Sequence, residues 1–146
     1  VGFDGGAGDT GELVAGVREL RAEYDFAADT VESIGDIVRT GESRLAAADP
    51  EADPDAELLA ELGRLMDFDH GLLEALGVAS RTLDNMVWAA REAGAHGAKL
   101  TGAGGGGCIV ALDETPETQT ALRYTAECHD TFRAELDREG VRVEAE

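Results

Sequence analysis

The sequence is short of basic residues, aromatic residues and cysteines. Its 146 residues include 12 lysines and arginines against 31 aspartates and glutamates, so the formal net charge is −19. Because neutralising phosphates requires a basic surface, this charge argues against nucleic acid as a partner. It disfavours docking on an anionic membrane surface for the same reason.

Two cysteines, Cys108 and Cys128, are too few for a disulfide framework, and the chain has no CxxC pattern of a zinc site. No apolar run approaches the roughly 18 residues of a membrane span, and no signal peptide opens the chain. Together these absences predict a cytosolic protein that does not contact a membrane.

The acidic excess also has an interpretation of its own. Lys99 is the only lysine, and aromatic residues make up 5% of the chain. Such a composition is typical of proteins from salt-accumulating halophiles, because molar salt shortens the Debye length to about 3 Å and screens carboxylate repulsion. The alternative is an ordinary acidic bacterial protein. The hydrophobic content of 43% predicts a folded core in either case.

The length fits one domain, residues 1–146. Because the chain opens at Val1 in an apolar segment that resembles the end of a strand, we expect it to be a piece of a longer protein. Capping signals, Asp9 with Glu12 and Asp29 with Glu32, precede helical apolar stripes. Helical spacing and flanking signals predict helices over about 10–24, 29–47, 55–76 and 80–94, with Gly77 just past the third.

The period then changes to that of strands. Ala98–Thr101 and Cys108–Leu112 are short β-like runs on either side of a glycine-rich loop. Thr115 and Pro116 predict the start of a long helix that ends near residue 139, at Gly140. Val141–Glu144 alternates like a final strand. The order of the elements predicts an α+β fold with helices on one face of an antiparallel sheet.

The glycine-rich loop is the most informative segment. Gly102, Gly104 and Gly107 satisfy G-x-G-x-x-G, but a dinucleotide fingerprint requires a helix directly after the loop, and here a strand follows. A nucleotide-hydrolase phosphate loop is excluded because no Lys-Ser/Thr follows the glycines. A strand–loop–strand of this kind allows close approach of a phosphate or another backbone. A plain hairpin loop is the alternative.

Three segments carry a family resemblance. The segment Ala98-Lys-Leu-Thr-Gly-Ala-Gly-Gly-Gly-Gly-Cys108 resembles the third motif of the galactokinase, homoserine kinase, mevalonate kinase and phosphomevalonate kinase superfamily. Thr10–Arg18 and Met66–Val78 are similar to segments of the mevalonate kinase family within it. The three occur in the family's order and span most of the chain.

The resemblance implies a ferredoxin-like C-terminal domain. Whole enzymes of this kind transfer the γ-phosphoryl group of ATP, with Mg²⁺, to the primary hydroxyl of mevalonate. Their phosphate loop and catalytic base lie in an N-terminal domain that nothing in this chain matches, so no catalytic residue or metal ligand is expected here. The N-terminal kinase domain is the expected partner, and a homodimer is left open. Alternatives are a phosphomevalonate kinase, a diphosphomevalonate decarboxylase, or a non-catalytic binding module.

The resemblance also implies two groups of site residues. The loop residues would brace the phosphate loop of the other half: Gly102, Ala103, Gly104, Gly105, Gly106 and Gly107. Four residues would lie on the substrate side: Thr10, Asp69, Lys99 and Thr101.

From the residues alone, several of these positions have a second interpretation. Thr10 also fits a plain position at a helix start. Asp69 stands in a leucine stripe, so it either lines a cleft or is buried with a partner; it also departs from the family that the chain resembles, which usually has Asn here. Lys99 either faces solvent or lies beside a phosphate-bearing cleft. His70 and His129 are predicted to be structural, and Cys108 to be a small buried hydrophobe.

Overall fold

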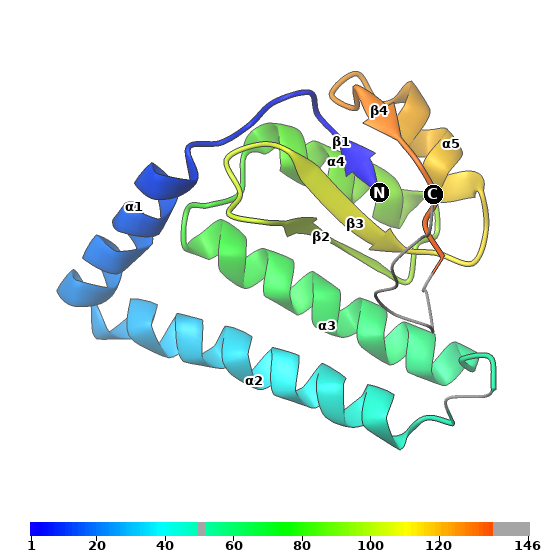
Figure 1. The fold of residues 1–146 in the computed structure, drawn as a ribbon, viewed down its shortest axis with the longest axis horizontal. Helices are drawn as coiled ribbons and strands as arrows, with labels where there is room; N and C mark the ends of the chain where they lie inside the picture. The colour runs from blue at the N-terminus through cyan, green and yellow to red at the C-terminus, as the bar shows by residue number, and fades with distance from the viewer. Residues whose placement is uncertain (50–51, 136–146) are drawn as a thin grey trace, which may run out of the picture.

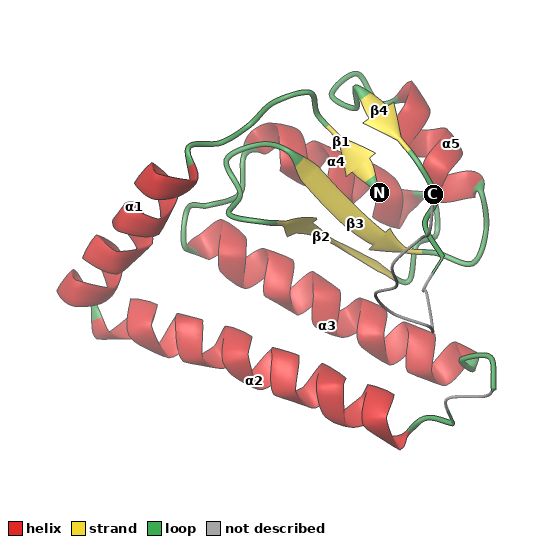
Figure 2. Cartoon of the chain, in the orientation of Figure 1, coloured by secondary structure: helices red, strands yellow, loops and turns green. Residues whose placement is uncertain are grey.

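The structure is a computed structural model that describes residues 1–49 and 52–135. Figures 1 and 2 show strands flanked by helices, so the α+β prediction is confirmed. In chain order the elements are β1 (Gly2–Phe3), α1 (Thr10–Glu23), α2 (Asp25–Ala47), α3 (Ala56–Ala75), α4 (Arg81–Glu92), β2 (Gly97–Thr101), β3 (Cys108–Leu112), α5 (Glu117–Tyr124) and β4 (Asp130–Thr131).

The strands form one sheet in the order β2-β3-β1-β4, and all neighbouring pairs are antiparallel. Taken with α4 and α5, this is the β-α-β-β-α-β order of a ferredoxin-like fold, as expected. The placement of the helices differs in part from the prediction. Helices α4 and α5 contribute to the core against the sheet, whereas α3 lies along the outer strand β2 and α2 packs against α3. Helix α1 contacts α2 at the far end of the molecule.

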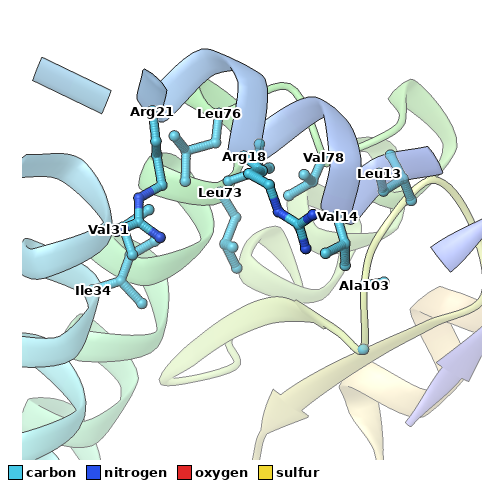
Figure 3. Close-up of a pocket in the computed structure, with 12 residues that line it drawn as sticks. Leu13, Val14, Arg18, Arg21, Val31, Ile34, Leu73, Leu76, Val78 and Ala103 are labelled. Carbon is cyan, nitrogen blue, oxygen red and sulfur yellow. The ribbon is translucent and has the colours of Figure 1, made fainter. Parts of the chain in front are cut away.

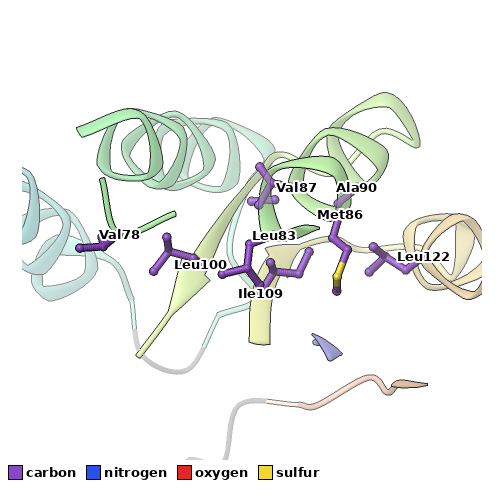
Figure 4. Close-up of a cluster of buried hydrophobic side chains, with 9 residues drawn as sticks. Val78, Leu83, Met86, Val87, Ala90, Leu100, Ile109 and Leu122 are labelled. Carbon is purple, nitrogen blue, oxygen red and sulfur yellow. The ribbon is translucent and has the colours of Figure 1, made fainter. Parts of the chain in front are cut away.

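The core contains no aromatic side chain among its described buried members, which pack around α4, α5 and the sheet (Figure 4). Its buried members are Val78, Leu83, Met86, Val87, Ala90, Ala98, Leu100, Ile109 and Leu122.

The predicted helix ends at α1, α3 and α4 are confirmed. The Asp9 carboxylate accepts a hydrogen bond from the Glu12 amide at 3.0 Å and caps α1. After α3, Gly77 takes a φ of +77° and its amide bonds the Glu74 carbonyl, while the Val78 amide bonds the Leu73 carbonyl. This is a Schellman motif, in which glycine supplies the left-handed residue that ends the helix.

The predicted start of α2 at Asp29 is wrong. Helix α2 begins at Asp25, and one extended residue, Tyr24, separates it from α1. Asp29 lies inside the helix, where its carbonyl oxygen accepts from the Ser33 hydroxyl at 2.8 Å. A capping pattern can also occur inside a helix. Here the chain is already helical four residues before Asp29.

The predicted long helix after Pro116 is also wrong. Helix α5 ends at Tyr124, and the chain returns to the sheet as β4, where the Phe132 amide donates to the Val1 carbonyl at 3.1 Å. Pairing with β1 therefore overrides the local helical pattern. At the start of α5 the Asp113 carboxylate, and not Thr115, accepts from the Thr118 amide. Gly140 and the strand predicted over 141–144 lie outside the described residues.

Helix α3 and strand β2 touch backbone to backbone. A Cβ added at Gly63 would overlap the His96 carbonyl, and one added at Gly97 would overlap the Gly63 carbonyl, so both positions require glycine. Side chains of α3 also accept hydrogen bonds from the edge of β2 that no described strand covers. The Ala98 amide donates to the Asp67 carboxylate at 3.0 Å, and the Leu100 amide donates to His70. This contact fixes β2, the strand that leads into the glycine-rich loop.

Candidate functional site at the glycine-rich loop

The loop joins β2 to β3 and depends on glycine for its conformation. Positive φ angles occur at Gly102, Gly104, Gly105, Gly106 and Gly107. Residues with a Cβ rarely adopt such angles, so this path is open to glycine and closed to most other side chains.

The loop is held by two other segments of the same chain. The Gly105 amide donates to the Val78 carbonyl at 2.7 Å. The Gly107 amide donates to the Asp4 carboxylate at 2.8 Å, and the Asp4 amide donates back to the Gly107 carbonyl at 2.9 Å. A Cβ at Gly104 would overlap the Val78 carbonyl, and one at Gly8 would overlap the Gly104 carbonyl. The close backbone approach expected from the sequence therefore takes place, at least in part, inside this chain.

Some loop amides remain available to an anion. Within residues 1–49 and 52–135, the amides of Ala103 and Gly106 have no hydrogen-bond acceptor. Free amides of this kind can donate to a phosphate oxygen. Asp4 weakens the site for a phosphate alone, because its carboxylate lies beside the loop and repels an anion. Among the described residues, no cluster of three His, Cys, Asp or Glu side chains is arranged to hold a metal ion.

Two threonines flank the loop. Thr101 is the last residue of β2, directly before the first loop glycine, and it is exposed. Thr10 is the first residue of α1, also exposed, two residues after the Gly8 that touches the loop. Neither hydroxyl has a hydrogen bond to the described part of the chain, so both residues keep the candidate role that the resemblance implied.

Asp69 and Lys99 form an ion pair away from the loop tip. Asp69 is 8% exposed, and the Lys99 ammonium lies 3.1 Å from its carboxylate and donates to the Leu100 carbonyl at 2.9 Å. The solvent-facing alternative for Lys99 is therefore wrong, and Asp69 is a buried carboxylate with a partner. The second carboxylate oxygen of Asp69 is buried and has no hydrogen-bond partner among the described residues.

His70 is structural, as predicted. Its Nδ1 accepts from the Leu100 amide at 3.3 Å, and its Nε2 lies 3.3 Å from the Asp84 carboxylate. Burial lowers the pKa of His70 below its ordinary 6.5, and the nearby Arg91 guanidinium lowers it further. The ring is therefore neutral near pH 7. His70 and Asp67 together occupy two outward amides of β2.

Sequence reasoning missed Asp67. Its carboxylate accepts from the Ala98 amide and lies 2.7 Å from the Arg91 guanidinium. Nothing local marks this position, because both partners come from elements more than twenty residues away along the chain. Cys108, expected to be buried, is half-buried.

A recess that the sequence did not indicate lies under α1 (Figure 3). We call it the α1 recess; its volume is about 430 Å³. It is lined by Leu13, Val14, Val17, Arg18, Arg21, Val31, Ile34, Leu73, Leu76, Val78, Gly102 and Ala103. Because Gly102 and Ala103 form part of its rim, the recess opens beside the glycine-rich loop.

Comparison with known proteins places this geometry in a family. The family described as GHMP kinases C terminal matches residues 55–129, which include α3, α4, α5, strands β2 and β3 and the glycine-rich loop between them. The chain belongs to the GHMP kinase C-terminal domain family.

The relatives of this GHMP kinase domain are named as mevalonate kinases. It is 40% identical over 146 residues to the mevalonate kinase of Thermococcus gammatolerans, which covers 99% of this chain and 42% of the relative. It is 42% identical to that of Pyrococcus horikoshii, with the same coverage. The chain thus spans 42% of the length of the curated relatives it matches.

Solved structures agree with this assignment. The L. major mevalonate kinase in complex with R-mevalonate superposes with a TM-score of 0.75 at 26% identity, over 88% of this GHMP kinase domain and 39% of that chain. The Methanococcus jannaschii mevalonate kinase gives a TM-score of 0.59 at 27% identity, over 83% of the domain and 33% of that chain. Of the helices in the described residues, none has the length and apolar character needed to cross a bilayer.

Proposed function

We propose that this chain is the C-terminal half of a mevalonate kinase, which transfers the γ-phosphoryl group of ATP to the primary hydroxyl of mevalonate. The observation that supports this most directly is the 40% identity to mevalonate kinases over 99% of the chain. The other half, which the relatives' greater length implies, would hold the nucleotide and the catalytic base.

The chain's own contribution is positioning. When bound, ATP with Mg²⁺ supplies the phosphoryl group and neutralises its oxygens, and such transfer depends mainly on alignment and electrostatic stabilisation. The free amides of Ala103 and Gly106 would donate to phosphate oxygens or to the backbone of the phosphate loop. Thr101 directly precedes the glycine-rich loop, Thr10 lies two residues after the Gly8 that contacts it, and both are exposed. The Lys99–Asp69 pair fixes β2 beneath them.

Three finer properties remain proposals. A halophilic origin is supported by the net charge of −19 and the single lysine. A cytosolic location is supported by the proposed substrates, because ATP and mevalonate are both water-soluble. A homodimer stays a prediction.

Phosphorylation assays test the proposed activity. A longer protein that joins this chain to its nucleotide-binding half should phosphorylate mevalonate with ATP and Mg²⁺, whereas the chain alone should not. Mixing the chain with the separately expressed half should restore part of the activity. Mevalonate phosphorylation by the chain alone would contradict the proposed division of labour. Preference for phosphomevalonate in the longer protein would move the assignment to another branch of the family.

The role of the loop needs a variant that leaves this chain folded. Gly105→Val is unsuitable, because the φ of +72° at Gly105 strains a β-branched residue and its Cβ would also lie 2.8 Å from the Leu13 side chain within the same chain. Gly102→Asn is better: a Cβ there meets nothing within 4 Å, and Asn tolerates its φ of +79° more readily than most residues. We expect this variant of the longer protein to raise KM for ATP with little loss of melting temperature. An unchanged KM for ATP would contradict the role in nucleotide binding that we assign to the loop.

A further inference from the structure

Helix α1 is poorly buried for an amphipathic helix. It has 14 residues and none is buried, whereas each of the other four helices in the described residues buries at least one. Val14 faces the α1 recess and is 50% exposed. Isolated helices shorter than about 12–15 residues are marginal, and protein helices of this length are stabilised mainly by packing of the apolar face. The apolar side of α1 therefore lacks part of its packing.

Two exposed arginines, Arg18 and Arg21, also line the α1 recess. In Figure 3, Arg18 and Arg21 extend from α1 among apolar side chains. Neither has an ion pair or hydrogen bond within the described part of the chain. Arg39, Arg44 and Arg91 each pair with a carboxylate, whereas Arg64, Arg81, Arg123 and Arg133, like Arg18 and Arg21, have no ion pair among the described residues. What sets Arg18 and Arg21 apart is their place: both are exposed and both line the same apolar recess, where a carboxylate supplied from outside could pair with them.

We infer that the α1 recess is a docking site for the nucleotide-binding half, and that it receives an apolar side chain flanked by a carboxylate. This inference rests on the proposed function, because it assumes that such a half precedes the chain. Docking would bury Val14 and pair Arg18 and Arg21 with a carboxylate. One surface of the nucleotide-binding half would therefore make both the apolar and the ionic contacts. Ion pairs formed in a site from which water is excluded are stronger than exposed ones.

The other half fits the recess better than a second copy does. The matched relatives have 58% of their length (100 − 42) outside the matched region, so a large surface remains to be placed. The rim of the recess includes Gly102 and Ala103, hence it is continuous with the loop proposed to meet that half. In dilute buffer, two copies of this chain would each bring a charge of −19, and their repulsion would oppose self-association through this face.

Thiol accessibility tests the inference without relying on a folding defect. In a background with Cys108→Ser and Cys128→Ser, Val14→Cys is compared with Val38→Cys. Val38 is a matched control because it is a valine of 60% exposure on α2 outside the recess. In the isolated chain both thiols should react with a maleimide at similar rates. In the longer protein Val14→Cys should react at least about tenfold more slowly, as expected of a covered site, and Val38→Cys should be unchanged.

Charge reversal supplies a second readout. Arg18→Glu should lower the melting temperature of the longer protein and leave that of the isolated chain unchanged. Arg64→Glu is the control, since Arg64 is exposed and outside the recess. Equal effects of the two reversals in the longer protein would overturn the ionic part of the inference.

The remaining outcomes each overturn one specific claim. Equal labelling of both thiols in the longer protein would overturn docking. Slow labelling of Val14→Cys in the isolated chain would overturn it too, because residues of this chain would then already cover the recess. If dodecyl phosphate stabilises the isolated chain and Val14→Asp abolishes this, the recess is a small-molecule site and the inference is wrong. Mevalonate phosphorylation is measured on the same preparations: activity without protection overturns docking alone, and protection without activity overturns the proposed function alone.

Discussion

Asp4 and Gly107 are joined by two hydrogen bonds although they are 103 residues apart. The Asp4 carboxylate accepts from the Gly107 amide, and the Asp4 amide donates to the Gly107 carbonyl. The same carboxylate oxygen accepts from the Gly6 amide at 2.7 Å. One side chain therefore holds both the end of the glycine-rich loop and the segment that leads from β1 into α1.

Replacing Asp4 by alanine should loosen the loop. Asp4→Ala removes the acceptor of two amides, and we expect a loss of about 1–3 kcal/mol in the free energy of unfolding. Urea unfolding and amide hydrogen exchange at Gly107 would measure both effects. Asp4→Asn is the control, because its side-chain carbonyl still accepts; it should retain most of the stability. Slow exchange at Gly107 in Asp4→Ala would contradict this role of the carboxylate.

Removing Asp69 should destabilise the fold by stranding the Lys99 ammonium. Breaking a buried ion pair costs roughly 3–5 kcal/mol, and we expect about 2–3 kcal/mol for Asp69→Ala because the Lys99 side chain retains 23% exposure. The double variant Asp69→Leu with Lys99→Met should recover most of the loss. Turnover of the longer protein with Asp69→Ala distinguishes this structural role from a role in lining a substrate cleft. Impaired turnover at unchanged stability would overturn the structural role of Asp69.

The protein should lose stability as the pH falls past the ordinary pKa of histidine. Burial lowers the pKa of His70 in the folded state below the 6.5 of the unfolded chain. Between these two values the unfolded state binds more protons, so the contribution of His70 is complete above 6.5, is lost as the pH drops toward the folded-state pKa, and is constant below it. Urea melts from about pH 5 to about pH 8 would show this slope. A slope of the same size in His70→Gln would assign it to other groups.

Salt should stabilise the chain if its composition is halophilic. The net charge of −19 produces self-repulsion in dilute buffer, and molar KCl screens it within about 3 Å. Thermal melts over a KCl series should show a melting temperature that rises with salt, by roughly 2–4 °C for each kcal/mol gained in a chain of this length. Sorbitol at matched concentration is the control for general solute effects. An unchanged melting temperature between dilute and molar KCl would contradict the halophilic interpretation.

The sequence determined the local elements whose signals lie within a few residues. The caps at Asp9 and Asp55 and the glycine after α3 set helix ends, since a capping side chain and its amide are neighbours in the chain. The two β-like runs around the loop were found because alternation and glycine are also local signals. The loop segment, together with the residues from Thr10 and Met66, carried the family resemblance for the same reason.

Only the tertiary structure decided the features that join distant segments. Helix α5 stops at Tyr124 because β4 is drawn into pairing with β1, which no local pattern shows. Lys99 turned inward because Asp69, thirty residues earlier on α3, neutralises its charge. The glycine-rich loop was recognisable from its letters, but its shape depends on Val78 and Asp4, which reach it only after the chain has folded. Sequence therefore limits what each segment can form, and packing between segments selects which of those forms persists.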